Sequence, residues 1–72
     1  MVYFALESKK TNNYKYYYFQ DRIGDEVKVT ENAEEAYAFH HTKDAKVFLL
    51  ENPDLAERFE VVGLTGKPKF HD

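Results

Sequence analysis

The residues best suited to chemistry are tyrosines that alternate along one segment with lysines close by. They are Tyr14, Tyr16 and Tyr18, with Lys9, Lys10 and Lys15 before or among them. Alternate side chains of a strand point to one face, so a strand over residues 14–20 would display the three rings side by side. Exposed tyrosines of this kind favour protein interfaces, and tyrosines beside cations also stack the bases of single-stranded nucleic acid.

These residues predict a binding protein, with a protein partner or a second copy of the chain, as in a homodimer, as the first hypothesis. The alternative is a single-stranded nucleic-acid-binding domain that uses the same tyrosines and lysines. A net charge of −3 weakens the electrostatic contribution on which nucleic-acid binding depends, so we prefer the protein partner. The acidic stretch from Asp21 to Glu35 is a second candidate surface, although a solvated helix end also explains it.

Three histidines form the one set that resembles a metal site: His40, His41 and His71. Neighbouring side chains point to different faces of a helix or a strand, so His40 and His41 would not converge on one ion. A zinc site also needs three or four converging ligands. We therefore expect no metal and no cofactor.

Catalysis has little support in the residue types. The chain has no cysteine, Ser8 is its one serine, and no nucleophile lies at a recognisable spacing from a base. Residues 63–67 resemble glycine-based phosphate and RNA loops only superficially, because the spacing and the flanking helices of those motifs are missing. We expect a turn there and a protein that is not an enzyme.

Length and composition predict one domain over residues 1–72, with a folded core over residues 2–64 and a C-terminal turn and tail over residues 65–72. A chain of this size buries only about 60% of its unfolded surface, so its stability should be modest. Without cysteine, a disulfide-stapled secreted domain is not expected. The N-terminus has no basic region, and no apolar run approaches a membrane span of about 20 residues. We expect a cytoplasmic protein without membrane contact.

Hydrophobic periodicity and turn residues predict the elements. Strands are expected over residues 2–8, 14–20, 27–30 and 59–64. A turn around Gly24 separates the second and third strands. A helical turn is expected within residues 30–36 from the cap Asn32, a main helix over residues 43–51 from the cap Thr42, and a short turn over residues 54–58 after Asn52-Pro53. Residues 37–41 fit either helix or strand.

This order indicates an α+β fold, in which a small antiparallel sheet of three or four strands carries the helices on one face. The strand order is left open. One sheet face would lack a helical cover, and the three tyrosines are expected to line it. The expected core is Val2, Phe4, Leu6, Tyr17, Phe19, Val27, Val29, Ala36, Phe39, Ala45, Phe48, Leu49, Leu55, Phe59 and Val61.

Part of the chain resembles small uncharacterised proteins of Gram-positive bacteria and their phages or prophages. The likeness lies in residues 29–36, in Phe39, and in Thr42-Lys43-Asp44-Ala45 followed by an apolar helix and a last strand. It covers about half the chain and rests on helix caps and core alanines, so it carries over no site residue. The resemblance implies a cytoplasmic accessory protein that binds and modulates a host protein.

Overall fold

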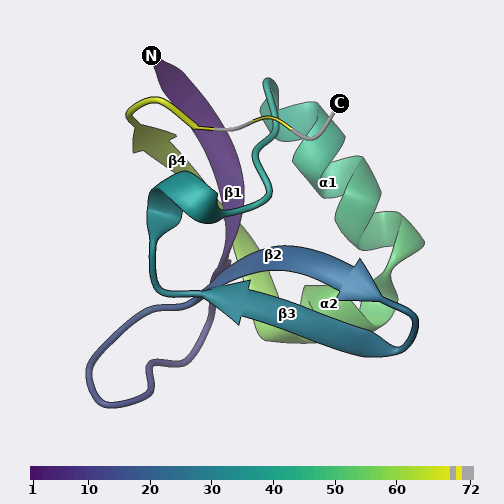
Figure 1. Ribbon diagram of the computed structural model, residues 1–72. Coiled ribbons are helices and arrows are strands. Elements are labelled where there is room, and N and C mark those ends of the chain that lie inside the picture. Colours follow the sequence, from purple (N-terminus) through teal and green to yellow (C-terminus); the bar gives the residue numbers. More distant parts are fainter. Residues whose placement is uncertain (69, 71–72) are drawn as a thin grey trace.

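The computed structural model describes residues 1–68 and Phe70, and it confirms the α+β fold (Figure 1). Its described strands form one antiparallel sheet in the order β3-β2-β1-β4. The strands are β1 (Val2–Ser8), β2 (Tyr18–Ile23), β3 (Glu26–Thr30) and β4 (Phe59–Thr65). The helical elements are the 3-10 turn η1 (Ala33–Glu35), the main helix α1 (Thr42–Glu51) and the short helix α2 (Pro53–Arg58).

The first and last strands form the longest pair in the sheet. β1 and β4 pair in continuous register from Val2 opposite Thr65 to Ser8 opposite Phe59. The expected strand over residues 2–8 is confirmed, and the last strand extends one residue beyond the predicted end. Pairing of β1 with β2 is confined to Glu7 opposite Tyr18, because β2 then turns away from β1 (Figure 1).

Residues 38 and 39 take the place that β2 leaves beside β1. The amide of Phe4 donates to the carbonyl of Phe39 at 2.9 Å, and the amide of Phe39 donates back at 2.8 Å. Residues 37–41 are therefore not helical: Ala38 and Phe39 form isolated bridges, and residues 40 and 41 lie in a bend before α1. Ala38 also forms an isolated parallel bridge to Phe70, so at Phe70 the predicted C-terminal tail returns to the fold.

The prediction for the second strand is wrong at its start. β2 begins at Tyr18 and continues to Ile23, whereas Tyr14, Tyr16 and Tyr17 belong to the preceding loop. These residues favour a strand by type, but a tight turn inside the loop prevents them from forming one; the turn is described below. The predicted turn at Gly24 is confirmed and is short, since β3 begins at Glu26.

The helices begin near the predicted caps. The side chain of Asn32 accepts a hydrogen bond from the amide of Glu34 at 3.0 Å, as expected for the cap of η1. Thr42 is already the first residue of α1, and His41 is its N-cap without a side-chain bond, so the cap prediction is wrong by one residue. The carbonyl of His41 accepts from the amides of Asp44 and Ala45, which closes the first turn. α2 has Pro53 in its first turn, as predicted.

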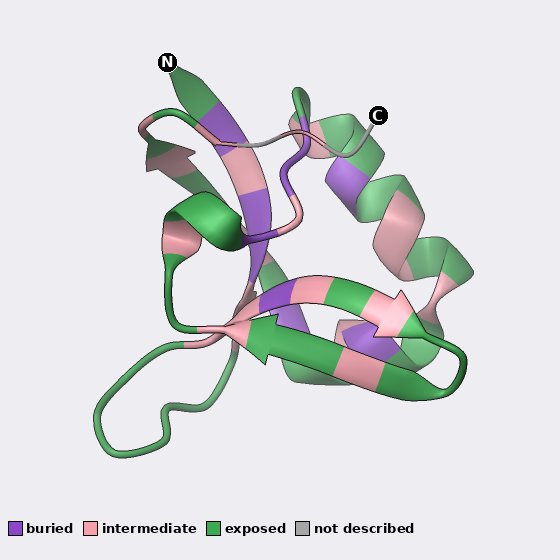
Figure 2. Ribbon diagram, in the orientation of Figure 1, coloured by how far each residue is buried: buried purple, intermediate pink, exposed green. Residues whose placement is uncertain are grey.

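β1 has buried residues on both of its faces, and its ribbon is largely coloured as buried or intermediate in Figure 2. On the helix side, Leu6 packs with Phe19, Phe39, Ala45, Leu55 and Phe59, joined by half-buried Phe4, Val27, Tyr37, Phe48, Leu49 and Val61. On the other side, Tyr3 and Ala5 pack with Ala36 and Ala38, joined by half-buried Tyr18, Leu64 and Phe70. The face expected to be bare is therefore covered by the segment that follows η1.

The predicted core is largely confirmed, with three corrections and three omissions. Val2 and Val29 are 59% and 38% exposed, and Tyr17 is half-buried at a surface hollow. The omissions are Tyr3, Ala5 and Ala38, which are all buried. They belong to the second cluster, which exists because residues 36–38 cover the face of β1 assigned to solvent. None of the described helices is long and apolar enough to cross a membrane.

Candidate functional site

The tip loop, residues 9–17, projects from the sheet between β1 and β2 (Figure 1). At its end the amide of Asn12 donates to the carbonyl of Lys15 at 3.0 Å, and the amide of Lys15 donates to the carbonyl of Asn12 at 3.1 Å. Asn13 and Tyr14 between them have φ of 55° and 63°. Two positive φ values inside a two-residue hairpin loop are the pattern of a type I′ turn.

Tyr14 combines an unfavourable backbone with a fully displayed ring. Its φ equals that of Gly24 in the β2–β3 turn, but a residue with a Cβ pays about 1–2 kcal/mol for the left-handed conformation. The residue is 99% exposed, so the ring makes no packing contact that could offset this cost. Asn13 tolerates the same backbone far better.

The structure separates the three tyrosines predicted to share a face. Tyr16 lies in the tip loop and is 48% exposed. Tyr18 lies in β2, half-buried against the cluster of Tyr3 and Ala5. Burial, and then its hydrogen bond with Glu7, raise the pKa of Tyr18. Tyr14 and Tyr16 therefore remain on the candidate surface, whereas Tyr18 supports the fold.

The lysines divide in a similar way. Nζ of Lys15 lies 3.8 Å from a carboxylate oxygen of Glu31, and both side chains are more than half exposed. Lys9 and Lys10 are exposed at the base of the tip loop. They border a surface hollow of about 360 Å³ together with Ser8, Glu57 and Arg58.

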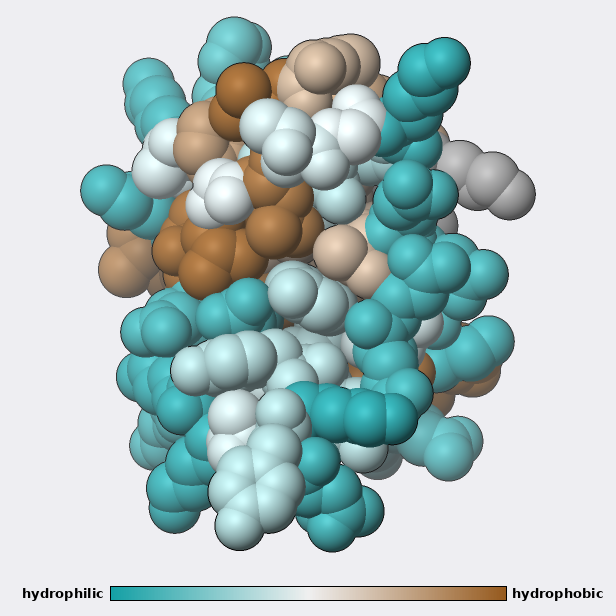
Figure 3. Space-filling model, turned by 90° about the vertical axis from the view of Figure 1, so that its left-hand side faces the viewer, coloured by the Kyte–Doolittle hydropathy of each residue, from teal (hydrophilic) through white to brown (hydrophobic). Residues whose placement is uncertain are grey.

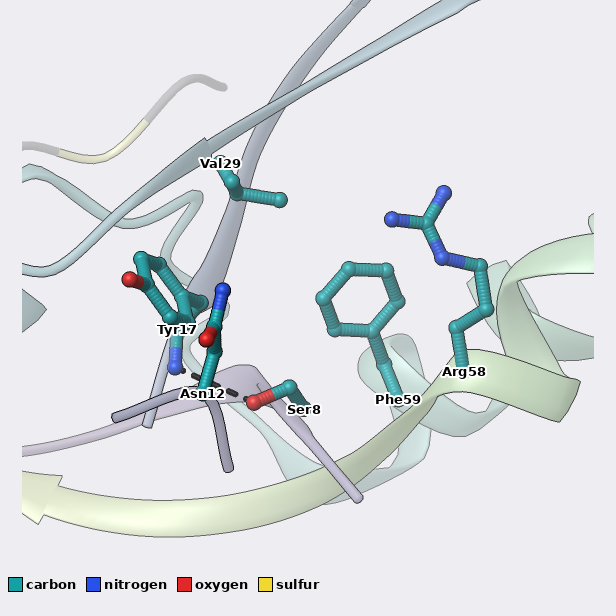
Figure 4. A pocket seen from close by; sticks show the side chains of 6 residues that line it. All are labelled: Ser8, Asn12, Tyr17, Val29, Arg58 and Phe59. Atoms are coloured by element: carbon teal, nitrogen blue, oxygen red, sulfur yellow. Dashed lines mark hydrogen bonds between the residues drawn. The ribbon is translucent and has the colours of Figure 1, made fainter. Parts of the chain in front are cut away.

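A second hollow of about 290 Å³ adjoins the first, since Ser8 and Arg58 border both. Figure 4 shows the rings of Tyr17 and Phe59 on opposite sides of it, with Asn12 between them near Ser8 and with Val29 above. The guanidinium of Arg58 lies 5.2 Å from the centre of the Phe59 ring. Phe59 is 2% exposed, so its ring offers almost no accessible surface to the hollow. Neither Tyr17 nor Arg58 was among the predicted site residues. Tyr17 was expected in the core, and Arg58 is distant in the sequence and reaches the loop only because the chain returns along β1 at β4.

The loop is held firmly where it leaves the sheet. The amide of Ser8 donates to the carbonyl of Tyr17 at 2.7 Å, and the amide of Tyr17 donates to Oγ of Ser8 at 3.0 Å. The amide of Lys9 donates to the carbonyl of Arg58 at 2.9 Å. These bonds join the two ends of the tip loop to each other and join its first residue to the last residue of α2, and the small hairpin closes the tip.

The other candidate groups show no convergence. The ring of His40 stacks on Phe70 with centroids 3.7 Å apart, and its centroid lies 6.4 Å from that of His41. His71 lies outside the described residues. Within residues 1–68 and Phe70, no three His, Asp or Glu side chains are grouped as metal ligands. Of the acidic stretch, Glu31, Glu34 and Glu35 are exposed around η1.

Comparison of the chain with protein-family models, with curated proteins and with solved structures finds no match. The candidate site therefore rests on its own geometry. That geometry offers one displayed aromatic ring, a second half-exposed ring, and cations at the base of a well-anchored loop.

Proposed function

We propose that this protein is a non-enzymatic binding module that docks on a cytoplasmic protein partner through the tip loop. The observation that carries the proposal is Tyr14, a fully exposed aromatic side chain on a left-handed backbone. Backbone strain that persists in a folded chain is a pointer to function. Because the ring contributes nothing to packing, we infer that its benefit arises when a partner covers it.

The size of the effect suits an interface anchor. A tyrosine ring buries roughly 150–250 Å² when a partner covers it, with few rotatable bonds to order. Tyrosine is enriched among the few residues that dominate binding energy. The anchored stem between Ser8 and Tyr17 reduces the ordering cost that a free loop incurs on binding. Tyr16 in the same loop, and Lys9 and Lys10 at its base, would form the polar rim of the docking surface.

The test is affinity capture from a cell lysate with the wild-type chain and with Tyr14→Ala, after nuclease treatment, read by mass spectrometry. A prey retained by the wild type and lost with Tyr14→Ala supports the proposal. The matched control is Leu50→Ala, which removes an 81% exposed apolar side chain from α1, away from the loop (Figure 1). Equal capture by the wild type and Tyr14→Ala, with both chains folded, would refute the tip loop as the docking surface.

Binding of single-stranded nucleic acid through the same loop is the second candidate. Its supporting observation is that Lys9, Lys10 and Arg58 border one hollow at the base of the loop that carries the exposed tyrosines. Glu57 in the same hollow and the Glu31 partner of Lys15 oppose it. Fluorescence anisotropy with a labelled oligonucleotide separates the two candidates. Affinity that falls steeply with salt and weakens in Lys9→Gln/Lys10→Gln supports nucleic acid, whereas a flat titration excludes it.

A further inference from the structure

β4 is an edge strand with few of the features that prevent edge strands of different molecules from pairing. It has seven residues, contains neither lysine nor proline, and has Glu60 as its one charged residue. The opposite edge, β3, is shorter and carries Glu26 and Lys28. Natural proteins blunt exposed edges with charge, proline or short strands, because an open row of amides and carbonyls pairs readily with another chain.

The hydrogen bonds of β1 show which groups of β4 point outward. Phe4 and Ser8 direct their backbone groups away from β4, to Phe39 and Tyr17. Alternate residues of an antiparallel pair exchange bonds, so the bonded pairs of β1 with β4 include Tyr3 with Leu64 and Ala5 with Val62. The bond from the amide of Gly66 to the carbonyl of Met1 agrees with this phase. Val61 and Gly63 therefore point their amides and carbonyls to the open edge.

This alternation of inward- and outward-pointing backbone groups along β4 is compatible with a two-fold axis through Val62. If β4 meets a second β4 in antiparallel fashion, the axis places Val61 opposite Gly63 of the other copy, and the reverse. Each such pair joins two outward-pointing residues and forms the bonded type of contact. The axis places Glu60 opposite Leu64 of the other copy, so the two carboxylates do not face each other.

The surface beside this edge is apolar. Val61, Val62 and Leu64 are half-buried, and Val2 at the start of β1 is 59% exposed. Figure 3, which faces the left-hand side of Figure 1, shows hydrophobic side chains gathered above the hydrophilic lower part of the molecule. A charged partner has little to recognise here, whereas a second copy brings the same apolar strand in matching phase.

We infer that two copies of this chain associate through β4, which extends the sheet across a two-fold axis at Val62. Such an isologous contact closes on itself, so it gives a dimer rather than a fibre. The pairing uses residues 60–64 of β4 and none of residues 9–17 of the tip loop. The inference is therefore independent of the proposed function, and each can fail alone.

Opposite charges at the axis provide the test, because Val62 would face Val62 of the other copy at about 4.5–5.5 Å between Cβ atoms. Val62→Lys alone and Val62→Glu alone place like charges together, and we expect each to weaken self-association roughly tenfold or more. An equimolar mixture should restore the dimer. The control Val62→Thr keeps the branched shape and should associate more tightly than either charged variant. Sedimentation velocity measures these four samples and the wild type.

Hydrogen exchange gives a second measurement that needs no variant. In the dimer the amides of Val61 and Gly63 become protected as protein concentration rises, whereas the amide of Val62, bonded to β1, is protected throughout. A wild-type chain that sediments as a monomer up to millimolar concentration would overturn the inference. So would charged variants that associate like the wild type, or concentration-independent exchange at Gly63.

Discussion

Replacing Tyr14 with glycine should make the protein more stable and a poorer binder. Glycine adopts φ of 63° without the roughly 1–2 kcal/mol that a Cβ costs there. Glycine also has greater conformational freedom in the unfolded chain, which lowers the gain in the free energy of unfolding by about 0.5–1 kcal/mol. Loss of the ring costs no packing energy in the folded chain, because the residue is 99% exposed. The net gain is about 0.5–1 kcal/mol, which corresponds to a rise in Tm of about 2–8 °C for a domain of this size.

The assay is thermal and urea unfolding by circular dichroism, with partner capture on the same samples. Tyr14→Ala is the matched control, because it removes the ring and keeps the strained backbone. We expect its stability to lie within about 0.5 kcal/mol of the wild type, and its binding to fall as in Tyr14→Gly. A Tyr14→Gly chain that is less stable than the wild type would show that the ring supports the fold. The strained backbone of Tyr14 would then give no indication of a binding role.

Two further predictions test hydrogen bonds that hold the fold together outside the tip loop. In Tyr3→Phe the bond from the hydroxyl to the carbonyl of Ala33 is lost, which should cost about 1 kcal/mol at neutral pH. Burial, and then the charge of Glu34, raise the pKa of Tyr3, so its stabilising contribution is full below about pH 10 and is lost as pH rises through the folded-state pKa. Urea unfolding at neutral and alkaline pH should therefore show a shallower alkaline loss in Tyr3→Phe, and parallel losses would contradict this. Asn52→Ala removes a donor to the carbonyl of Phe48 at 2.8 Å and an acceptor for Arg22 at 2.9 Å, which should cost about 1–3 kcal/mol. Asn52→Asp keeps the acceptor for Arg22, so its urea midpoint should lie between those of the wild type and Asn52→Ala. Equal midpoints for Asn52→Asp and Asn52→Ala would exclude a stabilising role for the bond to Arg22.

The sequence predicted those parts of the fold that local rules decide. Alternation located β1 and β4, the turn residues located Gly24, and the pair Asn52-Pro53 located the start of α2. Each of these depends on residues within a few positions of one another. The apolar residues of the helix side were predicted for the same reason, because period and type identify a buried face.

The errors concern contacts between distant segments. Nothing near Tyr3 indicates that Ala36 and Ala38 will cover it. Residues 38 and 39 form bridges and not a helix because Phe39 bonds to Phe4, which is far away in the chain. Arg58 reaches the tip loop only because β4 runs the length of β1. Such pairings depend on the whole topology, so propensity in a single segment cannot reveal them.

The misplaced start of β2 is informative in a different way. Residues 14–18 are rich in aromatic side chains and favour a strand, but the two asparagines before Tyr14 favour left-handed backbone and the type I′ turn. The turn prevails, and it carries Tyr14 into a conformation that suits glycine. Natural sequences break a local rule mainly at functional sites. The segment whose strand propensity failed is thus the segment that exposes the Tyr14 ring without packing contacts. The wrong strand prediction and the proposed binding site therefore fall on the same residue.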